Sequence, residues 1–163
     1  MILTDIHCHI LPGIDDGAAD MDMTKNMLNK MYEEGVRRVI ATPHYRVGMF
    51  EPSIPSIQKS YLEVKKYAKT IGTHGMEVKL GCEYHRADDM VNVLKNHQRP
   101  TMAGSNYVLV EFSSMDNYMK IRSKIYALVV AGYDPIIAHI ERYPSIIENP
   151  SSVTDMIEMG ALI

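Results

Sequence analysis

Short apolar runs alternate with helix-like patterns along all 163 residues of the chain, and this alternation constrains the fold more than any other feature. A short apolar run bounded by turn residues predicts a buried strand, whereas apolar residues spaced three and four positions apart predict a helix. Strands that alternate with helices form βα units around a parallel sheet. The sequence therefore predicts an α/β fold.

The expected elements follow one another without a linker, a repeat or a low-complexity tract. Strands are expected at residues 2–7, 36–42, 76–82, 107–110 and 134–138, with a short sixth strand at 161–163. Helices are expected at residues 20–35, 56–71, 88–96, 118–131 and 150–159. A chain of this length fits one domain better than two, so we expect a single domain over residues 1–163.

Composition narrows the class of protein. Hydrophobic residues make up 46% of the chain and charged residues 23%, which is typical of a folded globular protein. The formal net charge of −3 provides no positive field for a nucleic-acid backbone or an anionic membrane. Neither partner is expected.

The start of the chain lacks the basic and apolar stretches of a secretion signal. Apolar runs such as residues 127–131 are far shorter than the roughly 20 residues that span a bilayer. We therefore expect a cytoplasmic protein without membrane insertion. Its two cysteines, Cys8 and Cys82, are expected to be reduced thiols.

Potential metal ligands stand at the ends of the expected strands. They are His7, His9, His44, Glu83, Glu111 and His139. Because the carboxyl ends of parallel strands and the loops after them form one face of the fold, these side chains are expected to converge. This regular placement predicts a single pocket lined by imidazoles and carboxylates.

The first strand carries the densest group of these side chains. Asp5, His7 and His9 alternate with other residues, and in a strand that spacing puts them on one face. Two imidazoles so placed can hold one cation, although a His-x-His pair by itself is equally compatible with histidines that are only hydrogen-bonded. The Asp15-Asp16-Gly17 segment is by itself typical of a solvated turn, but its position soon after the histidines favours a place in the site.

Two further residues suit a site that binds an anion beside a metal. Glu111 follows four strand residues, where a charge is costly to bury unless it is paired or bound to a metal. Arg142 lies three residues after His139, and its planar guanidinium can donate two parallel hydrogen bonds to a phosphate in the same pocket. A surface salt bridge with Glu141 or Glu148 is the alternative for Arg142.

The sequence disfavours two phosphate chemistries. A cysteine-based tyrosine phosphatase needs an arginine six residues after its thiolate, and the matching positions for Cys8 and Cys82 hold Ile14 and Asp88. The glycine-rich P-loop of nucleoside triphosphatases does not occur either. Any phosphatase chemistry in this chain therefore has to depend on a metal.

Five segments form an ordered series of motifs: residues 5–18 (DIHCHILPGIDDGA), 41–45 (ATPHY), 81–84 (GCEY), 110–112 (VEF) and 138–143 (AHIERY). In sequence and in order they resemble the motifs of the PHP-type protein-tyrosine phosphatases of bacterial capsule and exopolysaccharide operons. The resemblance covers the whole chain. Five motifs in order are far more specific than any one of them alone.

The resemblance implies a distorted PHP-type (β/α) barrel that holds two to three metal ions. Mn²⁺ is the metal that it favours, with Fe²⁺ or Zn²⁺ as alternatives, and mixed imidazole and carboxylate ligands suit all three. By position, the implied metal ligands are His7, His9, Asp16, His44, Glu83, Glu111 and His139. The implied catalytic residues are Arg142, as a phosphate contact, and Asp16. The implied reaction is hydrolysis of phosphotyrosine on the tail of a partner tyrosine kinase by a hydroxide that bridges two metals.

Members of this family continue beyond the length of this chain, and a further Asp-x-His ligand pair and a second arginine lie there. The resemblance therefore implies a partial barrel of five or six parallel strands with an incomplete metal set, and an exposed sheet edge that self-association would cover. The sequence is equally compatible with a fragment of a longer polypeptide.

Two other functions stay open at this point. One is a different substrate on the same scaffold, as in histidinol phosphatases or polymerase-associated exonucleases, of which the acidic charge disfavours the nuclease. The other is a metal-binding remnant with impaired catalysis.

Overall fold

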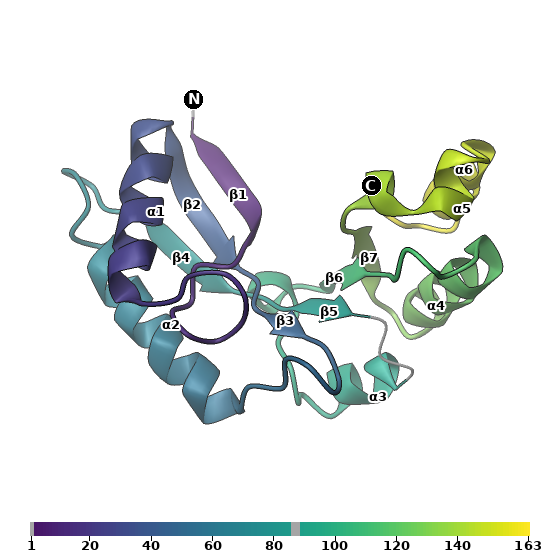
Figure 1. Ribbon diagram of the computed structural model, residues 1–163, viewed down its shortest axis with the longest axis horizontal. Helices are drawn as coiled ribbons and strands as arrows, with labels where there is room; N and C mark the ends of the chain where they lie inside the picture. Colours follow the sequence, from purple (N-terminus) through teal and green to yellow (C-terminus); the bar gives the residue numbers. More distant parts are fainter. Residues whose placement is uncertain (1, 86–88) are drawn as a thin grey trace.

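The computed structural model describes residues 2–85 and 89–163, which form an α/β fold with two parallel sheets (Figure 1). The strands are β1 (Leu3–Cys8), β2 (Val36–Ala41), β3 (His44–Tyr45), β4 (Glu77–Leu80), β5 (Glu83–His85), β6 (Tyr107–Glu111) and β7 (Asp134–Ile137). The α-helices are α1 (Met21–Glu33), α2 (Ile54–Ala68), α3 (Met90–Lys95), α4 (Tyr118–Val130), α5 (Pro144–Ile147) and α6 (Ser151–Glu158), and the 3-10 helices are η1 (Met102–Gly104) and η2 (Ile140–Arg142). The predicted fold class is confirmed.

Polar caps fix where the main helices begin. The Asp20 side chain accepts a hydrogen bond from the Met23 N–H and caps α1, at the residue where the sequence analysis expected this helix to start. Helix α2 begins at Ile54, earlier than predicted, because the Ser53 side chain caps it and Pro55 fits the first turn, where a backbone N–H has no helical partner. Pro55 therefore lies in the first turn of the helix, which the sequence analysis expected to begin at residue 56.

The sheets have the strand orders β1-β2-β4 and β3-β5-β6-β7, and every pair in these orders is parallel. β3 follows β2 after a short break, and β5 follows β4 in the same way. The strand predicted at residues 76–82 is observed as β4, which ends two residues earlier than predicted, at Leu80, and β5 starts after the break at Glu83. Gly81 lies in this break, where a Cβ atom would come within 2.9 Å of Met102 Sδ.

The strand positions form an open parallel array. When β2 with β3, and β4 with β5, are each counted as one interrupted strand, the described residues give five strand positions. These are β1, β2 with β3, β4 with β5, β6, and β7. Leu162 adds a single parallel bridge to Ile136, in which its N–H donates to Pro135 O at 2.8 Å and its carbonyl accepts from Ile137 N–H at 2.9 Å. The predicted partial barrel of five to six strands is confirmed, although residues 161–163 contribute a bridge and no full strand.

Helices cover the two sheets separately. In Figure 1, α1 and α2 lie along one side of β1, β2 and β4, whereas α4, α5 and α6 lie beyond β6 and β7. Leu28 of α1 and Val64 of α2 are fully buried in the core of the first sheet, and Ile121 and Ile125 of α4 in that of the second. Each such side chain contributes about 1.5–3 kcal/mol of burial free energy.

Some local predictions differ from the structure. The helix predicted at residues 88–96 is observed as α3, Met90–Lys95, and Asp88 lies outside the described residues. The short elements α5, η1 and η2 were not predicted. No helix in the described ranges is long and apolar enough to cross a membrane. The cytoplasmic location stays a prediction.

Candidate metal centre

Two imidazoles, those of His7 and His9, lie side by side at the end of β1. His7 lies in the strand and His9 just beyond it, and their Nε2 atoms are 3.3 Å apart. Cys8, between them, is buried, and its backbone N–H donates to Thr42 Oγ1 at 3.0 Å. Asp5 accepts a hydrogen bond from the His7 N–H at 3.0 Å. The alternation along the strand therefore aims both rings at the site, while Asp5 supports the backbone.

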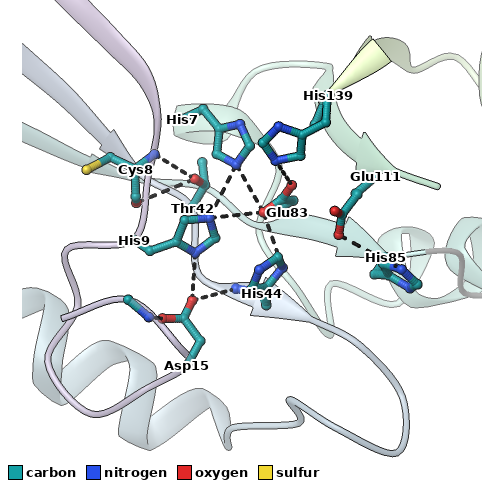
Figure 2. Close-up of polar contacts among 12 residues, drawn as sticks. His7, Cys8, His9, Asp15, Thr42, His44, Glu83, His85, Glu111 and His139 are labelled. Carbon is teal, nitrogen blue, oxygen red and sulfur yellow. Dashed lines mark hydrogen bonds and ion pairs between the residues drawn. The ribbon is translucent and has the colours of Figure 1, made fainter. Parts of the chain in front are cut away.

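Glu83, whose side chain has no exposed surface, is the centre of the site (Figure 2). Its Oε2 atom lies 3.0 Å from Nε2 of His7, 3.0 Å from Nε2 of His9 and 3.2 Å from Nδ1 of His44. Its Oε1 atom lies 3.5 Å from His139 Nε2. Four histidines, two from the end of β1 and one each from β3 and the segment after β7, thus surround one carboxylate.

The contacts around Glu83 are short, but they leave polar atoms without hydrogen bonds. Within the described residues, both Glu83 oxygens and His44 Nδ1 are buried and have no hydrogen-bond partner. Burying such atoms without a partner is costly. Ligands that lie about 2.0–2.2 Å from one ion are about 3.0–3.6 Å from each other, which matches the spacing of these atoms. The residues present therefore fit a bound cation.

The carboxylates and imidazoles shift each other's ionisation. Burial raises the pKa of Glu83, but contacts with His7 and His9 outweigh this and hold that pKa well below its usual range. Burial lowers the pKa of His9, but its hydrogen bond with Asp15 and its contact with the Glu83 carboxylate outweigh this and raise it to about 10. Burial, and then the negative charge of Glu83, raise the pKa of Glu111. The site is therefore rich in negative charge that a cation would compensate.

Three overlapping groups of side chains can each hold a metal ion. In every group the ligand atoms lie within 4.8 Å of one another. The groups are His7, His9 and Glu83; His9, Asp16 and His44; and His44, Glu83 and Glu111. Six of the seven predicted ligands thus come together in these groups, while His139 approaches through its contact with Glu83.

The predicted ligands do not all lie at strand ends. His44 and Glu83 start β3 and β5, directly after the breaks in the two interrupted strands. His139 follows β7 in the left-handed conformation, with φ 55° and ψ 39°. Asp16 lies in the loop after β1 with 63% of its side chain exposed, and its Oδ1 atom is 3.5 Å from His44 Nε2. The sequence therefore predicted the common face correctly and the strand boundaries less well.

Arg142, the predicted phosphate contact, lies in η2 with 62% of its side chain exposed. Its Nε atom is 3.5 Å from Glu141 Oε1, which is the surface ion pair that the sequence analysis named as its alternative. Its positive charge is close enough to lower the pKa of Glu111, after burial and Glu83 have raised it. A role in phosphate binding stays a prediction.

Two residues near the site were not among the predicted ligands or catalytic residues. The Asp15 side chain is buried beside His9, and its Oδ2 atom accepts a hydrogen bond from His9 Nδ1 at 2.8 Å (Figure 2). His85 Nε2 lies 3.9 Å from Glu111 Oε2. The spacing of Glu83 and His85, two residues apart like His7 and His9, was a signal that could have identified His85.

Comparison with known proteins agrees with this geometry. The sequence profile of the family described as capsular polysaccharide synthesis, CpsB/CapC, matches residues 3–163. The chain belongs to the CpsB/CapC family. It is 34% identical over 158 residues to tyrosine-protein phosphatase CpsB of Streptococcus pneumoniae, covering 97% of this chain and 65% of that protein. It is 33% identical over 165 residues to tyrosine-protein phosphatase YwqE of Bacillus subtilis, covering 98% and 62%.

A solved structure extends the match to three dimensions. In a crystallographic study of YwqE from Bacillus subtilis and CpsB from Streptococcus pneumoniae, described as metal-dependent tyrosine phosphatases, one chain superposes with a TM-score of 0.86 at 32% identity. The match covers 98% of this chain and 64% of that one. The chain thus spans less than two thirds of the length of these CpsB/CapC relatives.

Proposed function

We propose that this CpsB/CapC chain is a metal-dependent phosphomonoesterase that hydrolyses phosphotyrosine in proteins, with a role in capsule or exopolysaccharide regulation. The observation that carries the proposal is the buried Glu83 carboxylate, which lies within 3.0–3.2 Å of three imidazole nitrogens and forms no hydrogen bond in the described part of the chain. The tyrosine-phosphatase names and the metal dependence of the relatives support the same reaction.

The proposed metals are two to three divalent ions, with Mn²⁺ favoured and Fe²⁺ or Zn²⁺ as alternatives. Imidazole with carboxylate suits these ions, and the three overlapping ligand groups support more than one. Bound divalent ions would neutralise charge on phosphoryl oxygens and lower the pKa of water. The proposed ligands are His7, His9, Asp16, His44, Glu83, Glu111 and His139.

The side chains of this chain have distinct proposed tasks. Glu83 and the imidazoles around it hold positive charge at a fixed, largely buried place. Asp16 and Arg142 are the proposed catalytic residues, and both are exposed enough to meet a phosphoryl group that arrives from solvent. Arg142 would have to leave Glu141 and donate its parallel N–H groups to the phosphoryl oxygens.

The proposed substrate is a phosphotyrosine-bearing protein, such as the tail of a bacterial tyrosine kinase. Its test uses the purified chain with a phosphotyrosine peptide, histidinol phosphate and single-stranded DNA. We expect hydrolysis of the peptide only, abolished by a chelator and restored by Mn²⁺. Preference for histidinol phosphate would favour the alternative phosphomonoesterase, and bound metal without turnover would favour an impaired remnant.

Two variants locate the activity in the metal centre. His7→Ala or Glu111→Ala should remove it, because each deletes a ligand atom of one of the groups. His74→Ala is the matched control, since His74 is exposed in the turn between α2 and β4. Full activity in either ligand variant would refute the assignment.

We further propose that residues 1–163 form one PHP-type domain that self-associates through its open edge. β1 pairs only with β2 in the sheet orders of the described residues, and Leu3 and Ile6 are exposed along it. Unpaired strand edges recruit other strands. Size-exclusion chromatography with light scattering should show a dimer or larger species at micromolar concentration, and a stable monomer would contradict the proposal.

A further inference from the structure

Asp15 is buried beside the candidate metal centre without belonging to any of its ligand groups. Its side chain is only 1% exposed, and neither of its oxygens takes part in the three groups found among the described residues. Oδ2 accepts hydrogen bonds from His9 Nδ1 at 2.8 Å and from the His44 backbone N–H at 2.9 Å. Oδ1 accepts from the Gly17 N–H at 3.0 Å. Three donors therefore occupy this carboxylate.

These bonds determine which nitrogen of His9 faces the site. Because Nδ1 is bound to Asp15, Nε2 is the atom that points to Glu83 Oε2, at 3.0 Å, and to His7 Nε2, at 3.3 Å. A carboxylate on the far nitrogen of a ligating histidine fixes the tautomer and the ring orientation. Asp15 also accepts a hydrogen bond from the His44 backbone N–H, so the same carboxylate contacts a second proposed ligand residue. The centroids of the His9 and His44 rings lie 4.5 Å apart.

The loop after β1 is shaped to bring Asp15 to this place. The His9 carbonyl accepts from the Ala18 N–H at 3.0 Å, so the loop folds back onto His9. Gly17 allows this approach, since a Cβ atom there would lie 2.2 Å from the His9 carbonyl oxygen. The neighbouring Asp16 points outward and reaches His44 Nε2 instead. Adjacent aspartates thus have separate tasks.

We propose that Asp15 is a positioning residue that holds the His9 ring and the start of β3 in the geometry needed to bind metal. The inference rests on the proposed metal centre and adds a residue that is not itself a ligand. It acts through His9 and His44. Its loss should weaken metal binding about 10–100-fold, the usual effect of removing such an outer partner.

The test is Asp15→Asn, measured with Zn²⁺ alone in a competition titration against a chromophoric chelator. Asparagine keeps the shape but loses the charge and turns one acceptor oxygen into an NH₂ group, so at least one of the three donors loses its acceptor. We expect the Kd for Zn²⁺ to rise about 10–100-fold. Asp22→Asn, which removes an exposed carboxylate from α1, should leave the Kd unchanged. A wild-type Kd in Asp15→Asn would overturn the proposal.

A second measurement uses the wild-type chain and needs no variant to fold. In the Zn²⁺-loaded protein, nitrogen-15 NMR should show His9 coordinated through Nε2, with a protonated Nδ1 whose proton resonates downfield because it is bound to Asp15. Coordination through Nδ1 would overturn the proposal, and so would a chain that takes up no Zn²⁺, which would remove the proposed centre as well. Zn²⁺ binding with this signature but no phosphatase activity would refute the proposed function alone.

Discussion

His44 and Glu83 face each other as register partners at the start of the parallel strands β3 and β5, with His44 Nδ1 3.2 Å from Glu83 Oε2. Each begins the second piece of an interrupted strand. The breaks between β2 and β3 and between β4 and β5 therefore lie at the proposed metal centre, and the first residues of β3 and β5 are two of its proposed ligands.

Replacing Glu83 with glutamine should weaken metal binding more than any other single isosteric change. Among the described residues, the substitution removes the one carboxylate that contacts His7, His9 and His44 together. It should also lower the pKa of His9, because Glu83 is one of the groups that raise it. Calorimetric titration with Mn²⁺ measures the first effect and NMR titration of His9 the second. An unchanged Mn²⁺ affinity would show that Glu83 is not a ligand.

Metal binding should release protons and strengthen as the pH rises. Burial lowers the pKa of His9, but Asp15 and Glu83 raise it to about 10, so the metal-free folded chain carries a protonated His9 at neutral pH. A ligating imidazole must be neutral, and the ion therefore displaces that proton. Affinity should increase by up to about tenfold per pH unit and level off near pH 10. Calorimetry in two buffers of different ionisation enthalpy measures the released protons, and equal heats in both buffers would contradict this expectation.

The parts of the fold that follow local rules could be predicted from the sequence. The start of α1 at its Asp20 cap and the strand at β6 needed only spacing and capping chemistry. The breaks after β2 and β4 could not be predicted, because they depend on which strands pair across the sheets. The strand predicted at residues 76–82 is present as Glu77–Leu80, but β5, which pairs Glu83 with Leu109, had no counterpart among the predicted strands.

The candidate site, like the fold, could be predicted from the sequence only in part. That the candidate ligands come together could be predicted, because parallel strands bring their ends to one face. The choice between Asp15 and Asp16 could not, since it depends on how the loop folds back onto His9. The sequence analysis described the Asp15-Asp16-Gly17 segment as a turn whose position favours the site, and the family resemblance implied only Asp16 as a ligand. Both statements hold in part, because Asp15 accepts the Gly17 N–H in a turn and also holds His9.

The contact between α4 and α6 should depend on pH. Asp155 of α6 accepts hydrogen bonds from the Tyr118 hydroxyl and from Arg122 Nε, and these bonds lower the pKa of its carboxyl group. Because the carboxyl pKa is lower in the folded state, the ionised Asp155 stabilises the fold above the unfolded pKa of about 3.9. This stabilisation is lost as the pH falls through the folded pKa. Asp155→Asn should therefore lower Tm at pH 7, with a difference that shrinks below about pH 4. A Tm difference that is constant from pH 7 to pH 3 would contradict the assignment.

Gly17→Ala should damage both stability and metal binding, because the added Cβ would meet the His9 carbonyl oxygen at 2.2 Å and the His9 Cβ at 2.3 Å. Backbone must move to relieve this overlap, at a cost of about 1–3 kcal/mol or more, and the movement would displace His9. The comparison is Gly48→Ala, which meets no atom within 4 Å but has φ +79° and should cost about 1–2 kcal/mol through backbone strain alone. Urea unfolding gives both free energies, and a Zn²⁺ titration shows whether the site is affected. Gly48→Ala should bind Zn²⁺ like the wild type, whereas normal Zn²⁺ affinity in Gly17→Ala would show that the loop does not position His9.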